Sequence, residues 1–225
     1  MKKTIINLAL MGALAAVSNT VLADCKILPD HAALKTALSA ARSASNGGFN
    51  LDMWGTIVDR DGIVCAVAFT GVNRGDQWPG SRVISAQKAN TANAFSLPGL
   101  ALSTANLYTA VQPGGSLFGL QFSNPVDTTI AYKGPSKNYG RPNDPLVKSK
   151  IGGGNVFGGG LALYDSHKNI VGAIGVSGDA LRPDNIVYDI TAQAGQMPGA
   201  SASGWGHPSC ADGVAAIAAA LPVVQ

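Results

Sequence analysis

Two arginines and a lysine between residues 74 and 88 are of the types that hold an organic anion. Arg74 lies in a glycine-containing loop over residues 71–80, and Arg82 lies near the start of a segment with helical spacing of apolar residues over 81–95. A guanidinium beside the free amides of a helix start is suited to a carboxylate, so Arg74 and Arg82 are candidate ligand-binding residues. Lys88 is a third candidate, although six residues turn a helix by about 240°, so Lys88 and Arg82 need not share a face. For Arg82 and Lys88 a solvated or structural role, with Lys88 lying along a sheet, is the favoured alternative.

Other motifs in the chain give weaker evidence for catalysis or metal binding. Ser85-x-x-Lys88 has the spacing of serine–lysine hydrolases, but neither S-D-N nor K-T-G accompanies it. The aspartates at 59, 61 and 76 could bind a hard cation, yet turn formation explains them. No nucleophile with an oriented base can be assembled, so the residues favour a binding protein over a catalyst.

The glycine series Gly172, Gly175 and Gly178 is the most unusual pattern. It lacks the G-x-G start of a dinucleotide loop and falls in a hairpin pattern, so nucleotide binding is rejected. Glycine in a strand marks a close approach by a ligand or by another backbone. We therefore count Gly172 and Gly175 as ligand-binding candidates, with contact to a second subunit as the alternative.

The elements that must position these residues follow from periodicity. Helices are predicted over residues 28–45, 81–95 and from about 182, and hairpins over 53–59 with 63–69 and over 161–164 with 170–177. The hairpins share a motif, IVDRDGIVCAV against LYDSHKNIVGAI, which predicts that both pair in one antiparallel sheet. Residues 117–122 are expected to add a fifth strand, and residues 124–155 form a long loop without clear period.

The chain ends have different characters. Residues 1–23 have a basic start, an apolar run and small residues at the end, which predicts a secretory signal peptide and no membrane span after its removal. Without Lys2 and Lys3 the charge is near +1, from 16 basic and 13 acidic residues in the full chain, so charge gives no argument for nucleic acid. Residues 24–195 form the predicted single α+β domain, and 196–225 a Gly/Ser-rich tail with a short helix.

The three cysteines follow the predicted signal peptide. In an oxidising compartment, Cys25 and Cys210 are placed to tie the two ends of the mature chain together. Cys65 falls within an apolar strand pattern, so we expect it to be buried and free.

The motifs IVDRDGIVCAVAF, SRVISAQKANTANAF and GGGLALYDSHKNIVGAIGVSG lie in an order that resembles the GlcG/HbpS family, also called the haem-degrading domain family. The resemblance implies a profilin-like α+β domain with a five-stranded antiparallel sheet flanked by helices, and a homo-oligomer. It also implies non-covalent binding of haem or a related cofactor by a periplasmic or secreted protein. The chain has no C-x-x-C-H motif for covalent attachment.

Haem requires an apolar slot, an axial donor and cations for its propionates. Of His31, His167 and His207, we take His31 as the candidate iron ligand, because its helix is expected to flank the sheet. The alternative function is a binding or accessory protein for a small organic acid or alcohol that partners a periplasmic oxidoreductase, which Arg74, Arg82 and the long loop favour.

Overall fold

The computed structural model describes residues 23–43 and 51–178. Their strands form one antiparallel sheet in the order β2-β1-β4-β3. The helices and strands, with short 3₁₀ helices labelled η, are η1 (Cys25–Ile27), α1 (His31–Ser43), β1 (Trp54–Asp59), β2 (Val64–Phe69), α2 (Ser81–Phe95), η2 (Thr104–Leu107), η3 (Thr109–Val111), α3 (Leu120–Ser123), α4 (Thr128–Ala131), η4 (Ser136–Asn138), β3 (Gly160–Tyr164) and β4 (Ile170–Ser177).

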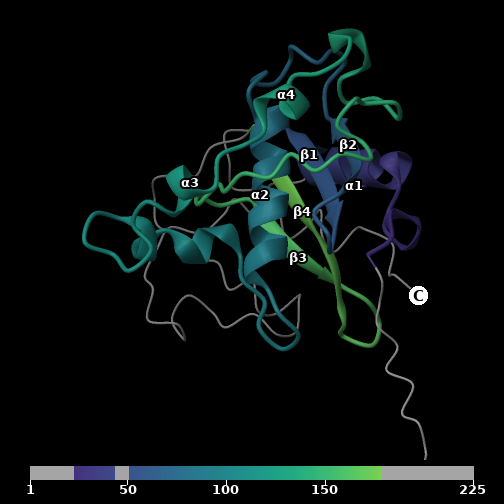
Figure 1. Ribbon diagram of the computed structural model, residues 1–225. Helices are drawn as coiled ribbons and strands as arrows, with labels where there is room; N and C mark the ends of the chain where they lie inside the picture. Colours follow the sequence, from purple (N-terminus) through teal and green to yellow (C-terminus); the bar gives the residue numbers. More distant parts are fainter. Residues whose placement is uncertain (1–22, 44–50, 179–225) are drawn as a thin grey trace, which may run out of the picture.

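The two predicted hairpins are confirmed, and they join through their first and last strands. β1 pairs with β4 in continuous antiparallel register from Trp54 opposite Ser177 to Asp59 opposite Gly172. The predicted helix over residues 81–95 coincides with α2, and the predicted first helix corresponds to α1. Figure 1 shows α2 lying along the sheet, whereas α1 lies toward the β2 side.

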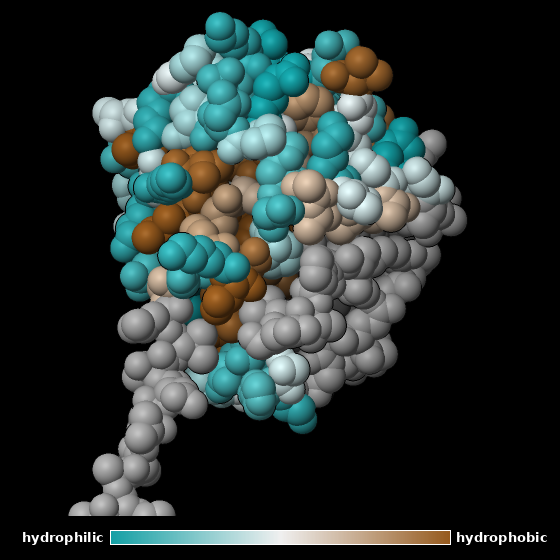
Figure 2. Space-filling model, turned by 90° about the vertical axis from the view of Figure 1, so that its right-hand side faces the viewer, coloured by the Kyte–Doolittle hydropathy of each residue, from teal (hydrophilic) through white to brown (hydrophobic). Residues whose placement is uncertain are grey.

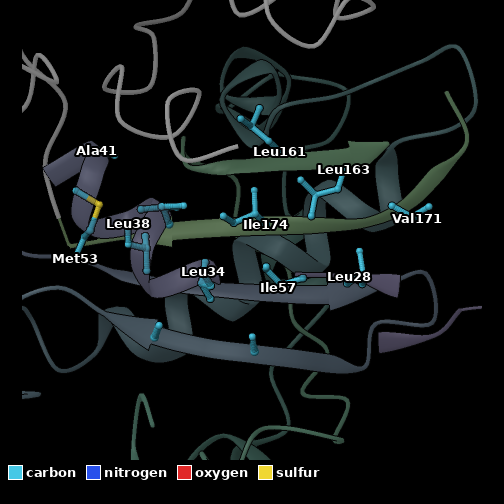
Figure 3. Close-up of a cluster of buried hydrophobic side chains, with 14 of the residues drawn as sticks. Leu28, Leu34, Leu38, Ala41, Met53, Ile57, Leu161, Leu163, Val171 and Ile174 are labelled. Carbon is cyan, nitrogen blue, oxygen red and sulfur yellow. The ribbon is translucent and has the colours of Figure 1, made fainter. Parts of the chain in front are cut away.

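One face of the sheet packs against α1. Leu34 and Leu38 of α1 are fully buried, and Figure 3 shows them beside Ile57 of β1, with Ile174 and Leu161 projecting from β4 and β3 into the same layer. Alternation along a strand places every second side chain on this face, which is why Ile57 and Ile174 belong here and their neighbours do not. This layer is the larger apolar core of the domain.

The opposite face packs against α2 at very short range. A Cβ atom at Gly175 would lie 2.0 Å from the Ser85 carbonyl oxygen and 2.4 Å from the Ala89 amide nitrogen. Gly160, which is paired with Gly175 in the sheet, would place a Cβ 2.5 Å from the Lys88 carbonyl oxygen. The backbone of α2 therefore occupies the space above these glycines, and close backbone approach accounts for both of them.

The predicted fifth strand at residues 117–122 is wrong. Turns and the single helical turn α3 (Leu120–Ser123) occupy this stretch, and Gly119 at its N-cap has a left-handed φ of +89°. The described residues thus form four strands in one α+β domain, and a profilin-like fold is not established. Instead, the long loop protects an outer edge, because Lys148 N donates to Val64 O (2.8 Å) and Val64 N donates to Ser149 O (2.9 Å).

The predicted Cys25–Cys210 disulfide is also wrong, because Cys25 is bonded to Cys65. The register between β1 and β2 shifts so that Ile57 pairs with Ala66 and Val58 with Val64, which leaves Cys65 as the extra residue of a bulge. A bulge re-aims the side chain of its unpaired residue, and here it allows Cys65 to meet Cys25 of η1. An alternating strand pattern in the sequence could not reveal this change of direction.

Replacing Cys65 by serine is expected to lower the free energy of unfolding by about 2–4 kcal/mol, because the disulfide closes a 40-residue loop. Urea denaturation followed by circular dichroism measures this loss. Peptide mapping without reduction should recover a Cys25–Cys65 peptide pair, and recovery of Cys25 linked to Cys210 would contradict the assignment.

Several sequence predictions lie outside the described residues. They are residues 1–22 of the predicted signal peptide, the helix from about residue 182, Cys210, and the tail over 196–225. Within the described ranges, no helix combines the length and apolar character needed to cross a membrane. Seen from the right-hand side of Figure 1, the described surface is mainly hydrophilic around a central apolar area (Figure 2).

Candidate functional site

A cavity of about 620 Å³ lies between the loop that precedes α2 and the segment that carries α4 and η4. Figure 1 shows α4 at the same end of the molecule as this loop. The lining residues come from β1, the loop, the start of α2 and the long segment, and are Trp54, Asn73, Arg74, Gly75, Pro79, Gly80, Arg82, Val83, Tyr132, Ser136 and Tyr139. A volume of this size is within the usual range for organic ligands and cofactors.

Arg82 forms the floor of the cavity and is held from several sides. Its Nε donates to Asp144 Oδ2 (2.9 Å), its second terminal nitrogen donates to Asp144 Oδ1, and the first donates to Ala131 O (2.8 Å). The guanidinium also lies 3.6 Å from the ring centroid of Tyr139. Because both members of the ion pair are almost fully buried, Arg82 anchors the long segment to α2. The structural alternative considered for Arg82 thus describes most of its contacts.

Arg74 has the opposite character. Its side chain belongs to an exposed stretch of the loop and lines the cavity. Among the described residues, it forms no ion pair with a carboxylate. The loop itself is fixed, since Asp76 Oδ2 accepts hydrogen bonds from Val72 N (2.7 Å) and Asn73 N (2.8 Å). Arg74 is therefore a cation on an ordered loop at the mouth of the cavity.

Trp54 contributes its indole ring to the cavity wall. It is 1% exposed, and its Nε1 has no hydrogen-bond partner in the part of the chain that the structure describes. An indole N–H is a donor only, and leaving a buried donor unpaired costs about 1–3 kcal/mol. Because Nε1 is also closed to solvent, Trp54 offers the cavity an aromatic surface and not this N–H.

Two tyrosines complete the wall. The hydroxyl of Tyr139 donates toward Tyr132 O (2.9 Å) and Lys133 O (3.2 Å), so its position is fixed by the α4 segment. Tyr132 is 62% exposed, and its ring adds an aromatic surface with a phenolic oxygen. The site thus combines aromatic and apolar walls with an exposed cation.

The cavity brings together only two of the predicted ligand-binding residues, Arg74 and Arg82. His31 is not part of the lining, and its Nε2 donates to Gly140 O (2.9 Å), which links α1 to the long segment. Lys88 is 4% exposed and donates from Nζ to Val176 O (3.0 Å), along the sheet as the structural alternative anticipated.

The two predicted glycines also lie away from the cavity lining. A Cβ at Gly172 would meet Val58 O at 2.2 Å, and Gly175 faces α2. Ligand binding by His31, Lys88, Gly172 and Gly175 stays a prediction that no contact in the described residues tests.

The sequence analysis missed Trp54, Tyr132 and Tyr139. Trp54 begins a strand whose apolar pattern is that of a core, and only its unpaired Nε1 distinguishes it from an ordinary core residue. The tyrosines are in a segment without periodicity, so the sequence does not predict where they lie. The Arg82–Asp144 pair holds this segment against α2 and thereby brings both tyrosines to the cavity. The available signal was the unusual length of that segment.

These features define an α+β domain with helices on both faces of an antiparallel sheet and an aromatic cavity at one end. The chain belongs to the family of HbpS-like haem degrading proteins, whose model matches residues 29–192. This match confirms the family resemblance derived from the three motifs.

Two solved structures are similar to parts of the chain. One is described as the crystal structure of a PduOC:heme complex, with 22% identity, a TM-score of 0.43, and coverage of 66% of this chain and 79% of the other. The second is the Klebsiella pneumoniae protein ORFY, with 23% identity, a TM-score of 0.40, and coverage of 76% and 86%. The comparison with curated proteins found no match.

Proposed function

We propose that this protein binds haem or a related planar cofactor non-covalently in the cavity between the pre-α2 loop and the α4 segment. The observation that carries the proposal is the aromatic wall of the cavity together with the exposed Arg74. The description of its family as haem degrading proteins supports the choice of ligand.

The lining residues fit the chemistry of such a cofactor. Trp54, Val83 and Tyr139 offer an apolar and aromatic contact surface for a flat ring. The guanidinium of Arg74 would hold a propionate at the mouth. Bound haem would supply a redox-active iron centre.

Two side chains are candidates for the iron ligand. Tyr132 lines the cavity and carries a phenolic oxygen, a ligand type that haem proteins use. His31, the choice made from sequence, lies outside the lining and uses Nε2 toward Gly140, so it would reach iron only after the α4 segment moves. We therefore propose Tyr132 as the axial donor and His31 as the alternative.

Titration of the purified protein with haemin is expected to produce a protein-bound Soret band that saturates at one equivalent. Tyr132→Phe should change the charge-transfer bands and weaken binding at least about tenfold, while Arg74→Ala should weaken binding about tenfold because one charge-assisted contact is lost. Absorption and resonance Raman spectra separate phenolate from imidazole ligation.

Arg141→Ala is the matched control, because Arg141 is exposed on the same segment but does not line the cavity. A spectrum identical to that of free haemin at stoichiometric protein contradicts the proposal. A spectrum altered by His31→Ala and unchanged by Tyr132→Phe transfers the axial role to His31.

The alternative function is the binding of a small organic acid in partnership with a periplasmic oxidoreductase. The exposed guanidinium of Arg74 is also a suitable partner for a single carboxylate. A thermal-shift screen with hydroxy acids separates the two functions: a shift with an acid and none with haemin favours the alternative. We further propose that the mature protein is periplasmic or secreted and forms homo-oligomers, for which fractionation and light scattering are the tests.

A further inference from the structure

A second cluster of reactive groups lies at the other end of β1, away from the cavity. Cys25, Asp59 and Cys65 place their two sulfurs and a carboxylate oxygen within 4.8 Å of one another. Trp54 and Asp59 are the first and last residues of β1, so roughly 17 Å of strand separates the cluster from the cavity wall. The cluster is therefore independent of the proposed cofactor site.

Asp59 uses only one of its carboxylate oxygens in the hairpin turn. Oδ1 accepts hydrogen bonds from Asp61 N (3.0 Å) and Ile63 N (2.9 Å), which explains why an aspartate begins this turn. Oδ2 faces Sγ of Cys25 at 4.0 Å. A disulfide sulfur has no hydrogen to donate, so within the described residues Oδ2 has no donor while the disulfide is intact.

This arrangement is costly because Asp59 is only 1% exposed. A buried carboxylate oxygen requires a hydrogen-bond donor or a cation, and neither disulfide sulfur supplies one. The two cysteines are partly exposed, so reductants and ions can reach the cluster from solvent. The unsatisfied oxygen thus points toward the position at which a cation would lie between the three side chains.

We propose that the dithiol form of this cluster is a binding site for a thiophilic divalent cation of the zinc class. A dithiol reductant breaks the Cys25–Cys65 bond by thiol–disulfide exchange: it is oxidised to its own disulfide, and its two thiol protons pass to the two cysteine sulfurs. The cation then displaces both thiol protons, binds the two thiolates and Asp59 Oδ2, and completes its coordination with water.

The backbone supports such a site without a change of fold. The Cα atoms of Cys25 and Cys65 are 5.2 Å apart. Two Zn–S bonds of about 2.3 Å at a tetrahedral angle hold the sulfurs about 3.8 Å apart, which rotation about the side-chain bonds provides. The backbone amides of the turn hold Oδ1 of Asp59 and so fix the orientation of the carboxylate. Oδ2 therefore already faces the position of the cation.

Cobalt titration of the full chain before and after reduction tests the proposal, with Co²⁺ standing in for Zn²⁺. The reduced protein, freed of reductant under anaerobic conditions, should bind one equivalent with thiolate-to-cobalt charge-transfer bands that Zn²⁺ abolishes. The oxidised protein should show no such bands. Asp59→Asn should weaken binding by at least about tenfold, because the amide keeps the turn acceptor but replaces the charged ligand oxygen.

Three controls make every outcome decisive. Asp61→Asn changes an exposed acid in the same turn and should leave the affinity unchanged, and Cys210→Ser removes the third thiol with the same expectation. Cys65→Ser should abolish the charge-transfer bands and leave the haemin titration unaffected, which separates this site from the cavity. Equal cobalt binding by oxidised and reduced protein, insensitivity to Asp59→Asn, or unfolding on reduction would each overturn the proposal.

Discussion

Replacing Arg82 by methionine is expected to lower the free energy of unfolding by about 3–5 kcal/mol, because the change leaves Asp144 as an uncompensated buried charge. The side chains of Arg82 and Asp144 are 2% and 0% exposed. Among the described residues, the donors left to Asp144 would be Gly140 N (2.6 Å) and Leu146 N (2.8 Å). Urea denaturation followed by circular dichroism measures the loss.

The matched control is Arg141→Met, an exposed arginine on the same segment, for which we expect a change within about 0.5 kcal/mol. Arg82→Lys should give an intermediate loss, since lysine keeps the charge without the two-pronged geometry. Equal stability of the Arg82→Met and Arg141→Met proteins would show that the buried pair does not hold the long segment.

Replacing Gly175 by alanine is expected to destabilise the domain by about 3 kcal/mol, the upper end of the usual cost of overpacking, because the added methyl group lies between β4 and α2. The added Cβ would lie 2.0 Å from the Ser85 carbonyl oxygen, and this atom belongs to the helix backbone and cannot rotate away. Thermal unfolding and expression in the soluble fraction are the measurements.

Gly80→Ala is the comparison, because nothing lies within 4 Å of a Cβ there and its φ of −63° suits any residue. Its expected cost is at most about 1 kcal/mol, from the poorer helix-capping preference of alanine. If Gly175→Ala is as stable as Gly80→Ala, the close packing of α2 on the sheet is not required for the fold.

The sheet could be predicted from the sequence because its signals are local. Alternating apolar residues and turn residues between strands specified both hairpins, and their shared motif correctly predicted that both hairpins belong to one antiparallel sheet. The α2 helix followed from apolar spacing alone. The prediction of a fifth strand over residues 117–122 was wrong although the composition of this stretch is strand-like. Gly119 adopts a left-handed conformation that turns the chain there.

The candidate site was harder to predict from the sequence than the sheet, because it depends on contacts between distant parts of the chain. Arg74 and Arg82 were found from their charge and position, but Asp144 is 62 residues from Arg82 and lies in a segment without periodicity. Cys65 was assigned correctly to a strand, yet the bulge that turns its side chain has no local sequence signature here. The composition of the site and the direction of the Cys65 side chain therefore depend on long-range pairing and on a bulge, which local sequence patterns do not reveal.

The division between buried and exposed lining residues has a consequence for how such a cavity can diversify. Arg82 and Tyr139 carry the contacts that secure the cavity floor, whereas Asn73, Arg74, Tyr132 and Ser136 occupy exposed or rim positions. Surface substitutions away from structural contacts cost little stability. A lineage with this scaffold can therefore exchange rim residues, and with them its ligand, without first acquiring compensating mutations in the core.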